Sequence, residues 1–571
     1  MSVYKAPVAD MKFVLQDIIG LGHLQKAADL DDAMVETILE EAGKLATNVL
    51  DPLNKVGDRS PSKLEQGAVK TPPGFKGAYQ QYCEGGWNGV PFNPVFGGQG
   101  LPIALGFAIQ EMWQAANMSF GLCPMLTQAA VEAIEIHGTK EQQDLYLAKL
   151  VSGAWTGTMN LTEPQAGTDL AALKTKAIKQ ADGSYKISGQ KIFITYGEHD
   201  FTDNIIHMVL ARTPDAPEGV KGISLFLVPK ILPDGTRNDL QCVGLEHKMG
   251  IHGSPTCTMQ YGDHGGATGW LVGGENEGLK CMFTMMNNAR LNVGLQGVAI
   301  AERAYQHALD YARNRVQGTR VSEKNGSRVA IIEHADVRRM LLSMKSQIEA
   351  GRMLTYEAAL AIDRAHEGDA PAKAQAQALV DLLTPVVKSW CTDMACHVTS
   401  TGVQVHGGMG FIEETGAAQY YRDARITPIY EGTNGIQAID LSMRKILANK
   451  GIAASAWIND ARTHVQALPP GDDQQYLQEA LTALETATQY LLARGAAADL
   501  ESIAAVNMPY LNAFGYIAGG VMMARAFVKG DDDKKLTATF YFRHVLPSYK
   551  GFIDTVLQGA SAVCDVAAAR F

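Results

Sequence analysis

Apolar residues recur every three or four positions through long stretches of the first 155 residues. This spacing gathers apolar side chains on one face of an α-helix. The predicted helices are 30–58, with Asp31 or Asp32 as N-cap, 103–121 and 128–153. Residues 79–102, rich in glycine, proline and aromatic side chains, are a predicted loop. Together these elements predict a helical domain over residues 1–155.

The pattern changes near Trp155, where short stretches of alternating apolar and polar positions begin. A period of two is typical of β-strands. The strongest case is 183–195, which follows the turn pair Asp182-Gly183. Further strands are predicted over 205–212, 222–230 and 256–261. Strands at this spacing favour an antiparallel sheet or barrel, which we place at residues 156–278.

Helical periodicity returns from residue 279. Long helices are predicted over 282–316, 333–367 and 372–405, which indicates a bundle over 279–450. The sequence LPPGDD is a linker signal within an alanine-rich helical stretch, which we assign to an extra domain over 451–571. Because strands do not alternate with helices, a doubly wound sheet is excluded. The predicted fold class is α+β and multidomain.

Composition narrows the function classes. The 571 residues include 50 Lys+Arg and 60 Asp+Glu, for a net charge of −10. A dedicated nucleic-acid binder is normally basic, so we expect no nucleic-acid partner. The eight cysteines form no CxxC and there is no HExxH, so we expect reduced thiols and no metal site. No apolar run reaches about 18 residues and the N-terminus has no signal-like apolar core, so we expect a cytoplasmic protein without a transmembrane segment.

Glu431 is the candidate general base. It lies between the apolar pair Ile429-Tyr430 and the flexible turn 432–435. A carboxylate held beside apolar groups is desolvated, which disfavours its charged form and raises its pKa. A raised pKa suits a general base at neutral pH. The alternative is a loop glutamate that caps the following helix.

Two glycine-containing segments could hold a ligand. In LTEPQAGTDLAALKTKA (161–177) a turn presents backbone N–H groups and the hydroxyls of Thr162 and Thr168. Such a turn can hold an anion or the edge of a ring, although an ordinary loop has the same composition. HGGMGF (406–411) allows close backbone approach to a flat ligand, and tight helix packing explains it equally well.

A group of arginines follows the first long helix of the predicted bundle. Arg313, Arg315 and Arg320 could pair with phosphate groups. A solvated helix end is the alternative explanation for the same residues.

Taken together, these segments resemble the acyl-CoA dehydrogenase family over roughly residues 80–445, in the family's order. LTEPQAGTD resembles the flavin-loop signature TEPxAG[ST]D, and SGQKIFIT resembles a strand in which Phe193 replaces the usual Trp. The remaining matching segments are NARLNVGLQGVAIAERAYQHALDYARNR (288–315), QVHGGMGF (404–411) and RITPIYEGTNGIQ (425–437). The resemblance implies an N-terminal helical domain, a middle β domain and a C-terminal four-helix bundle, with flavin adenine dinucleotide (FAD) between the last two.

The resemblance also implies roles for individual residues. The residues implied to contact the flavin ring side are Leu161, Thr162, Gly167, Thr168, Phe193 and Thr195. Those implied near the adenosine diphosphate part are Thr433 and Asn434, and those implied to reach a partner subunit's flavin are Arg315, Gln404, Gly407 and Gly408. The implied substrate contacts are Thr168, Tyr430, Gly432 and, near coenzyme A, Arg290. Gln317 and Gly318 replace the hydroxyl and aromatic residues usual after Arg315, so their contacts to a partner's flavin are in doubt.

The implied activity is α,β-dehydrogenation of an acyl-CoA thioester. Glu431 takes the α-proton, the β-hydrogen leaves as hydride to the flavin, and an electron-transfer flavoprotein receives the electrons. Some members place the base just before Arg290, but Ala289 stands there, which favours Glu431. The extra domain resembles that of a longer subfamily and predicts a homodimer. Fatty acid β-oxidation is the expected process.

Other functions stay open at this point. KMGIHGSPTC (248–257) and RVQG (315–318) look most like the branch acting on 3-methylmercaptopropionyl-CoA, so 3-(methylthio)propanoyl-CoA is the alternative substrate. An acyl-CoA oxidase would use oxygen as acceptor instead. A nucleic-acid-associated relative of the alkylation response would need a basic C-terminal surface, whereas this one is slightly acidic. A catalytically silent scaffold would not need Glu431.

Overall fold

The computed structural model describes residues 3–323 and 326–570, which group into two compact units. Unit 1 comprises residues 1–41, 102–111 and 290–571, and unit 2 comprises residues 42–101 and 112–289. The predicted order of helices, then strands, then helices is confirmed along the chain. The four predicted domain ranges stay predictions, because contacts divide the chain into these two units.

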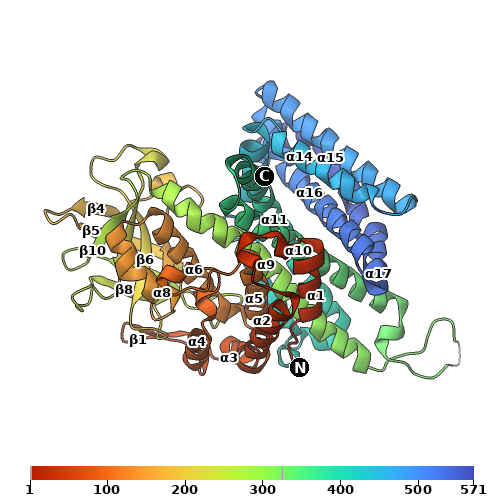
Figure 1. The fold of residues 1–571 in the computed structure, drawn as a ribbon, viewed down its shortest axis with the longest axis horizontal. Coiled ribbons are helices and arrows are strands. Elements are labelled where there is room, and N and C mark those ends of the chain that lie inside the picture. The colour runs from red at the N-terminus through yellow and green to blue at the C-terminus, as the bar shows by residue number, and fades with distance from the viewer. Residues whose placement is uncertain (1–2, 324–325, 571) are drawn as a thin grey trace. The chain divides into compact units, whose positions relative to one another are not determined.

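Unit 2 contains an eight-stranded sheet, seen at the left of Figure 1. Its strands are β3 (Thr156–Asn160), β4 (Lys176–Lys179), β5 (Tyr185–Thr195), β6 (Ile205–Ala211), β7 (Ser224–Pro229), β8 (Leu240–Leu245), β9 (Thr256–Tyr261) and β10 (Ala267–Val272). The order is β3-β6-β7-β10-β5-β9-β8, with β4 paired to β5. A separate hairpin joins β1 (Lys63–Glu65) to β2 (Ala68–Lys70).

The predicted strands are confirmed, and one pairing differs from the antiparallel expectation. All neighbouring strands pair antiparallel except β3 and β6, which are parallel. A parallel pair needs a long connection between its strands, and here the chain makes β4 and β5 before it returns at Ile205. The sheet core is apolar, as at Ile187, Val209, Phe226 and Met259.

Only some of the helices in the first 155 residues begin at a polar side-chain cap. The helices of this range are α1 (Val8–Phe13), α2 (Asp32–Leu45), α3 (Asp51–Arg59), α4 (Phe75–Glu84), α5 (Ile103–Ala116), α6 (Met118–His137), α7 (Lys140–Gln142) and α8 (Ala148–Val151). Asp31 caps α2, since its Oδ1 accepts from the backbone N–H of Met34 at 2.7 Å. Asn117 caps α6 in the same way, which divides two helices where the apolar pattern alone runs on.

The predicted loop at 79–102 is partly wrong, because α4 continues to Glu84. Tyr79 and Tyr82 are buried one turn apart on α4, and the helix ends where Gly85 and Gly86 follow. Aromatic residues at this spacing anchor a helix even in a glycine-rich segment.

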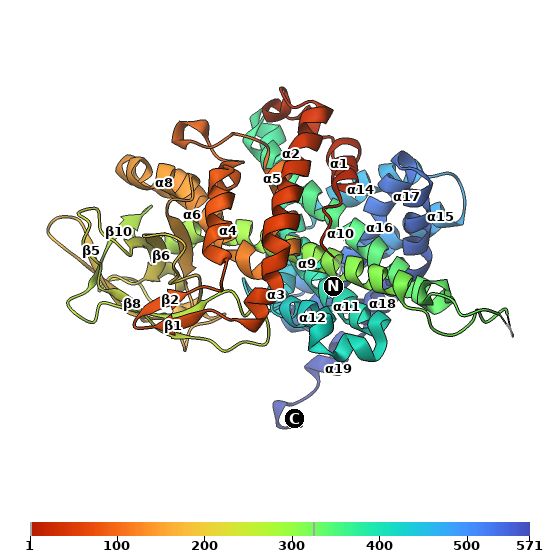
Figure 2. The same cartoon turned by 90° about the horizontal axis from the view of Figure 1, so that it is seen from below.

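Unit 1 is a helical assembly. Its helices after residue 290 include most of α9 (Gly278–Asn314), then α10 (Ala335–His366), α11 (Ala370–His406), α12 (Ala417–Ala424), α13 (Asn434–Ile439), α14 (Ile452–Gln466), α15 (Asp472–Ala496), α16 (Leu500–Lys529), α17 (Asp532–Phe540), α18 (Tyr549–Gln558) and α19 (Ala560–Cys564). The predicted long helices are thus confirmed to within a few residues. The predicted linker 468–473 joins α14 to α15, and Figure 2 shows the chain's C-terminal end projecting beyond α19.

Helix α16 is the core of the C-terminal part. It packs against α10, α11, α15, α17 and α18 (Figure 1). A Cβ atom on Gly515 would lie 2.4 Å from Cγ of Trp390, so this glycine lets α16 approach α11 closely. By length and composition α16 is apolar enough to cross a membrane, but 72% of the relevant window is buried inside the protein, as in the central helix of a bundle.

A buried ion network joins four helices of unit 1. Arg352 on α10 binds Glu111 of α5 at 2.6 Å and Glu302 of α9 at 2.9 Å, and it also binds Asp10 of α1. Arg352 is 1% exposed and Glu111 is 0% exposed. Tyr356 adds a hydrogen bond to Glu111 at 2.7 Å. Losing one partner of such a network leaves an uncompensated charge in the interior.

Arg352→Met should therefore lower the free energy of unfolding by about 3–5 kcal/mol, since three carboxylates would lose their shared cation. Thermal and denaturant unfolding of the purified protein measure this. Arg339→Met is the matched control on the same helix, because Arg339 pairs with Asp336 at an exposed site and should leave the transition unchanged. An Arg352→Met protein as stable as the parent would contradict the assignment.

Candidate active site

The turn that presents Glu431 has an unusual backbone. Glu431 has φ of 55° and Gly432 has φ of 84°, so two consecutive residues are left-handed. This conformation costs a non-glycine residue about 1–3 kcal/mol and is found mostly at functional sites. Gly432 is required as well, because a Cβ there would lie 2.9 Å from Nε2 of Gln437. Gln437 in turn donates to the carbonyl oxygen of Gly432 at 3.2 Å, which holds the turn closed.

The alternative role for Glu431, as a helix cap, is wrong. Thr433 caps α13, because its Oγ1 accepts from the backbone N–H of Ile436 at 3.3 Å. The Glu431 carboxylate is therefore not used by the helix that follows it.

Burial raises the pKa of Glu431, as the sequence predicts, and the positive charges of Arg290 and Lys388 offset part of that rise. The side chain is half-buried. Arg290 is contributed by α9 and Lys388 by α11, so the base is held between helices that are far apart in the sequence. A half-buried carboxylate with a raised pKa and nearby cations can accept a proton at neutral pH.

Arg290 and Tyr430 lie beside this turn. Arg290 is buried, with Nη1 3.9 Å from Oδ2 of Asp440, and its Nη2 would lie 3.8 Å from a Cβ on Gly432. The Tyr430 hydroxyl donates to Oε1 of Gln296 on α9. That bond occupies the hydroxyl proton. The predicted substrate contacts of Arg290, Tyr430 and Gly432 stay predictions, and all three residues lie at the base.

Asn434 is built into the bundle. Its Oδ1 accepts from Nζ of Lys388 at 2.9 Å, and its Nδ2 donates to Oδ1 of Asp393 at 2.8 Å and to the carbonyl oxygen of Ser389 at 3.2 Å. The side chain is thus fully used within unit 1. The predicted cofactor contact of Asn434 stays a prediction, and only the backbone of this residue is left to make it. Thr433, the residue before it, is exposed.

Lys388 is a residue that sequence reasoning missed. It lies within the apolar run LLTPVVKSWC (382–391) on α11 and is 0% exposed. A lone lysine inside an apolar helical stretch was the available signal. Burial lowers the pKa of Lys388 to about 7, against the opposing effect of Glu431 and Asp393.

The loop over residues 161–175 of unit 2 is held by a buried ion pair. Oε1 of Glu163 lies 2.9 Å from Nζ of Lys191 and accepts from Oγ1 of Thr175 at 2.6 Å. Backbone N–H groups of Lys174 and Thr175 also donate to this carboxylate at 2.8 and 3.0 Å. Burial opposes ionisation, but the charge of Lys191 and these hydrogen bonds outweigh it and hold the pKa of Glu163 at about 2. Glu163 and Lys191 thus anchor the loop, a role that sequence reasoning did not assign.

The anchored loop presents an open backbone next to an exposed ring. Gly167 is exposed with nothing within 4 Å of its Cβ position, and Thr168 beside it is exposed too. The N–H of Ile192 donates to the carbonyl oxygen of Thr162 at 2.9 Å, which ties the loop to β5. A bulge in β5 follows, where Phe193 has φ of 60° and is 57% exposed. An open loop backbone at Gly167 next to the exposed ring of Phe193 can accommodate a flat ligand.

Of the remaining residues predicted in unit 2, Leu161 and Thr195 are partly buried at the two ends of this surface. The carbonyl oxygen of Leu161 accepts from Nζ of Lys191 at 2.9 Å, and that of Thr195 accepts from Oγ1 of Thr158 at 2.7 Å. Both are therefore held by the same strands as the loop, and their cofactor roles stay predictions.

Unit 1 offers a second open backbone at the end of α11. Gly407, with φ of 60°, and Gly408 have nothing within 4 Å of their Cβ positions. Gly410 differs, since a Cβ there would lie 2.2 Å from the carbonyl oxygen of Val403. Close packing therefore explains Gly410 and does not explain Gly407 or Gly408. Gln404 and Arg315 are both exposed.

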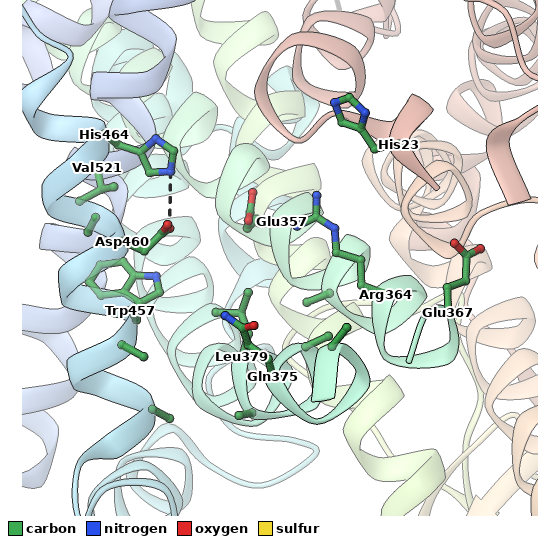
Figure 3. A pocket seen from close by; sticks show the side chains of 18 of the residues that line it. His23, Glu357, Arg364, Glu367, Gln375, Leu379, Trp457, Asp460, His464 and Val521 are labelled. Atoms are coloured by element: carbon green, nitrogen blue, oxygen red, sulfur yellow. Dashed lines mark ion pairs between the residues drawn. The ribbon is translucent and has the colours of Figure 1, made fainter. Parts of the chain in front are cut away.

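The large cavity in Figure 3 belongs to another part of unit 1. It has a volume of about 660 Å³ and is lined by α10, α11, α14, α16 and residues 23–25. Figure 3 shows Trp457, Asp460 and His464 on one side, with the His464 ring 3.5 Å from the Asp460 carboxylate. None of its described lining residues is a predicted site residue. We therefore place the active site at Glu431 and not at this cavity.

Glu163→Gln should loosen the loop in unit 2, because Lys191 would stay buried without a counter-charge. We expect faster amide hydrogen exchange over residues 161–175. Asp182→Asn is the matched control, since Asp182 caps an exposed turn in the same unit. Unchanged exchange over 161–175 in the glutamine variant would show that the ion pair does not hold the loop.

Four family models match successive ranges of the chain between residues 36 and 567. Family models described as "Acyl-CoA dehydrogenase, N-terminal domain", "middle domain" and "C-terminal domain" match residues 36–154, 158–264 and 276–446. A fourth, "Acetyl-CoA dehydrogenase C-terminal like", matches residues 457–567.

Individual relatives span most of the chain. A 3-methylmercaptopropionyl-CoA dehydrogenase of Ruegeria pomeroyi is 48% identical over 532 residues, which is 90% of each chain. A butyryl-CoA dehydrogenase of Syntrophomonas wolfei is 38% identical, covering 80% of this chain and 78% of that protein. The structure of a Bacillus anthracis acyl-CoA dehydrogenase complexed with FAD has a TM-score of 0.76 at 20% identity, covering 98% of this chain and 92% of that one.

Proposed function

The chain belongs to the acyl-CoA dehydrogenase family, and we propose that it dehydrogenates a short-chain acyl-CoA thioester with Glu431 as the base. It is an FAD-dependent oxidoreductase of that family. The observation that carries the residue assignment is the half-buried Glu431 carboxylate, whose pKa is raised by burial in a left-handed turn.

Glu431 accepts the α-proton of the thioester. A base with a raised pKa has a higher proton affinity, which suits removal of a weakly acidic C–H proton. Within the part of the chain that the structure describes, the backbone N–H of Glu431 donates to no acceptor. A free donor next to the base can stabilise negative charge as it develops on the thioester carbonyl oxygen. The product is a trans-2-enoyl-CoA.

The open surface of the loop in unit 2 fits the ring system of FAD. The exposed backbone of the loop at Gly167 and the outward Phe193 ring suit a flat ring system. FAD, when bound, supplies the acceptor for the hydride that leaves the β-carbon. The residues proposed to hold it in one subunit are Leu161, Thr162, Gly167, Thr168, Phe193, Thr195, Thr433 and the backbone of Asn434.

A second copy of the chain is proposed to complete each cofactor site. Gly407 and Gly408 leave room for a ligand to approach the backbone, and Gln404 and Arg315 are exposed. These four residues are proposed to reach the FAD of the partner in a homodimer. The guanidinium of Arg315 is suited to a phosphate group.

The relatives' names support a short acyl chain. One is named for 3-methylmercaptopropionyl-CoA and another for butyryl-CoA, and both acyl groups are short. We propose 3-(methylthio)propanoyl-CoA as a substrate because of the higher identity to the first. Butyryl-CoA is the second candidate, and its oxidation would place the enzyme in fatty acid β-oxidation. An electron-transfer flavoprotein is the proposed electron acceptor.

Glu431→Gln should keep bound FAD and acyl-CoA binding but slow substrate-dependent flavin bleaching by about 10²–10⁴-fold, because the amide cannot accept the proton. Stopped-flow absorbance measures the rate. In the parent enzyme the rate should rise with pH through a pKa above the ordinary 4.5 of glutamate, since the ionised carboxylate is the active form. Glu413→Gln, at an exposed ion pair with Arg422, is the control and should bleach normally. Near-normal bleaching in Glu431→Gln would identify a different base.

A substrate panel tests the proposed chain length. With an artificial acceptor, kcat/KM should be highest for 3-(methylthio)propanoyl-CoA or butyryl-CoA and fall for decanoyl-CoA and palmitoyl-CoA. Repeating the assay with an electron-transfer flavoprotein and with oxygen alone identifies the acceptor. Preference for palmitoyl-CoA would overturn the short-chain proposal, and rapid turnover with oxygen alone would indicate an oxidase.

A further inference from the structure

Lys388 is a buried cation without an ion-pair partner. Its side chain is 0% exposed, and among the described residues no carboxylate lies within 4 Å of its Nζ. A buried ammonium group costs free energy unless other groups compensate for the lost water. Its compensation here is one hydrogen bond to Oδ1 of Asn434 at 2.9 Å, together with the field of the carboxylates around it.

The Lys388–Asn434 bond connects α11 to the turn of the base. Asn434 is the first residue of α13, three positions after Glu431. Two further groups on the same turns of α11 also bind its amide, the Asp393 carboxylate at 2.8 Å and the carbonyl oxygen of Ser389 at 3.2 Å. The start of α13 is therefore clamped onto α11, and the strained Glu431 backbone is fixed at its C-terminal side.

Lys388 also supplies the less neutralised of the two positive charges near Glu431. Arg290 on α9 lies 3.9 Å from Asp440, so part of its field is cancelled. Asp393 on α11 faces Lys388 and is itself influenced by Arg425. Burial raises the pKa of Asp393, and Asn434, Lys388 and Arg425 offset part of that rise. The charge of Lys388 also acts on Glu431, whose ionised form it favours.

We propose that Lys388 is a positioning residue for the base: through Asn434 it holds the turn that presents Glu431, and its positive charge favours the ionised form of that carboxylate. This inference rests on the proposed function, since it concerns the residue assigned as the base. It adds a residue that is fully buried in the bundle. Its effect is on the proton affinity and the placement of Glu431.

The test is the pH dependence of flavin bleaching in the Lys388→Met holoenzyme at saturating butyryl-CoA. Loss of the positive charge should move the acidic limb of the rate profile upward by roughly one pH unit. Lys445→Met is the matched control, because Lys445 lies in the same unit but pairs with Asp381 at 3.3 Å, and its limb should not move. An unmoved limb in Lys388→Met holoenzyme would overturn the proposal.

An infrared titration separates this inference from the proposed function. The protonated-carboxyl band that disappears in Glu431→Gln reports the pKa of Glu431 without any turnover. That pKa should be higher in Lys388→Met than in the parent, whatever the enzyme's substrate is. If none of the acyl-CoA substrates bleaches the flavin of the parent enzyme, the proposed function is wrong. If the pKa of Glu431 is the same in the parent and in Lys388→Met, the proposed role of Lys388 is wrong.

Two milder variants cover the case in which Lys388→Met does not accumulate as holoenzyme. Lys388→Arg keeps the charge and should leave the acidic limb in place. Asn434→Ala keeps the charge but cuts the clamp, so it should lower the maximal rate at every pH. An upward-shifted limb in the arginine variant, or a full rate in the alanine variant, would count against the proposal.

Discussion

The balance between desolvation and positive charge at Glu431 is the constraint on which the proposed chemistry depends. Burial raises the pKa of this carboxylate, and the positive charges of Arg290 and Lys388 offset part of that rise. The two cations come from α9 and α11, so the proton affinity of the base is set by helix packing. The helix that follows is capped by Thr433, so the Glu431 carboxylate is not used as its cap.

A buried glutamate beside a positive charge also occurs in unit 2, but there the pKa of the glutamate is lowered. Glu163 is buried as well, but Lys191 and several hydrogen bonds outweigh the burial and hold its pKa low. One glutamate is thus kept ionised as a structural anchor, whereas the other has its proton affinity raised. Environment, and not residue type, separates the two roles.

Packing in unit 1 stabilises the strained backbone at Glu431. Arg352 joins four helices through three carboxylates, and α16 covers α10 and α11 with closely approaching glycines. A closely packed bundle can hold Glu431 in the left-handed conformation and keep Lys388 buried. In a looser structure both side chains would adopt less costly conformations. The C-terminal helices therefore contribute to the bundle that positions the base.

Much of the fold could be predicted because its signals are local. Apolar spacing predicted α9, α10 and α11 to within a few residues, and alternation predicted β5, β6, β7 and β9. Capping chemistry predicted Asp31 or Asp32 at the start of α2, and the structure shows that Asp31 is the cap. The parallel pairing of β3 with β6 and the extent of α4 were not predicted, because strand partners and buried aromatic anchors depend on residues distant in the sequence.

By itself the sequence determined the long helices of the bundle and four strands of the sheet, and it placed a glutamate beside apolar residues and a glycine turn. Those features depend on neighbours within a few positions of the chain. Only the tertiary structure decided that Lys388 binds Asn434 beside the turn of Glu431, that Glu163 pairs with Lys191, and that Thr433 rather than Glu431 caps α13. A pKa and an ion pair depend on distances in space, which packing sets and spacing along the chain does not.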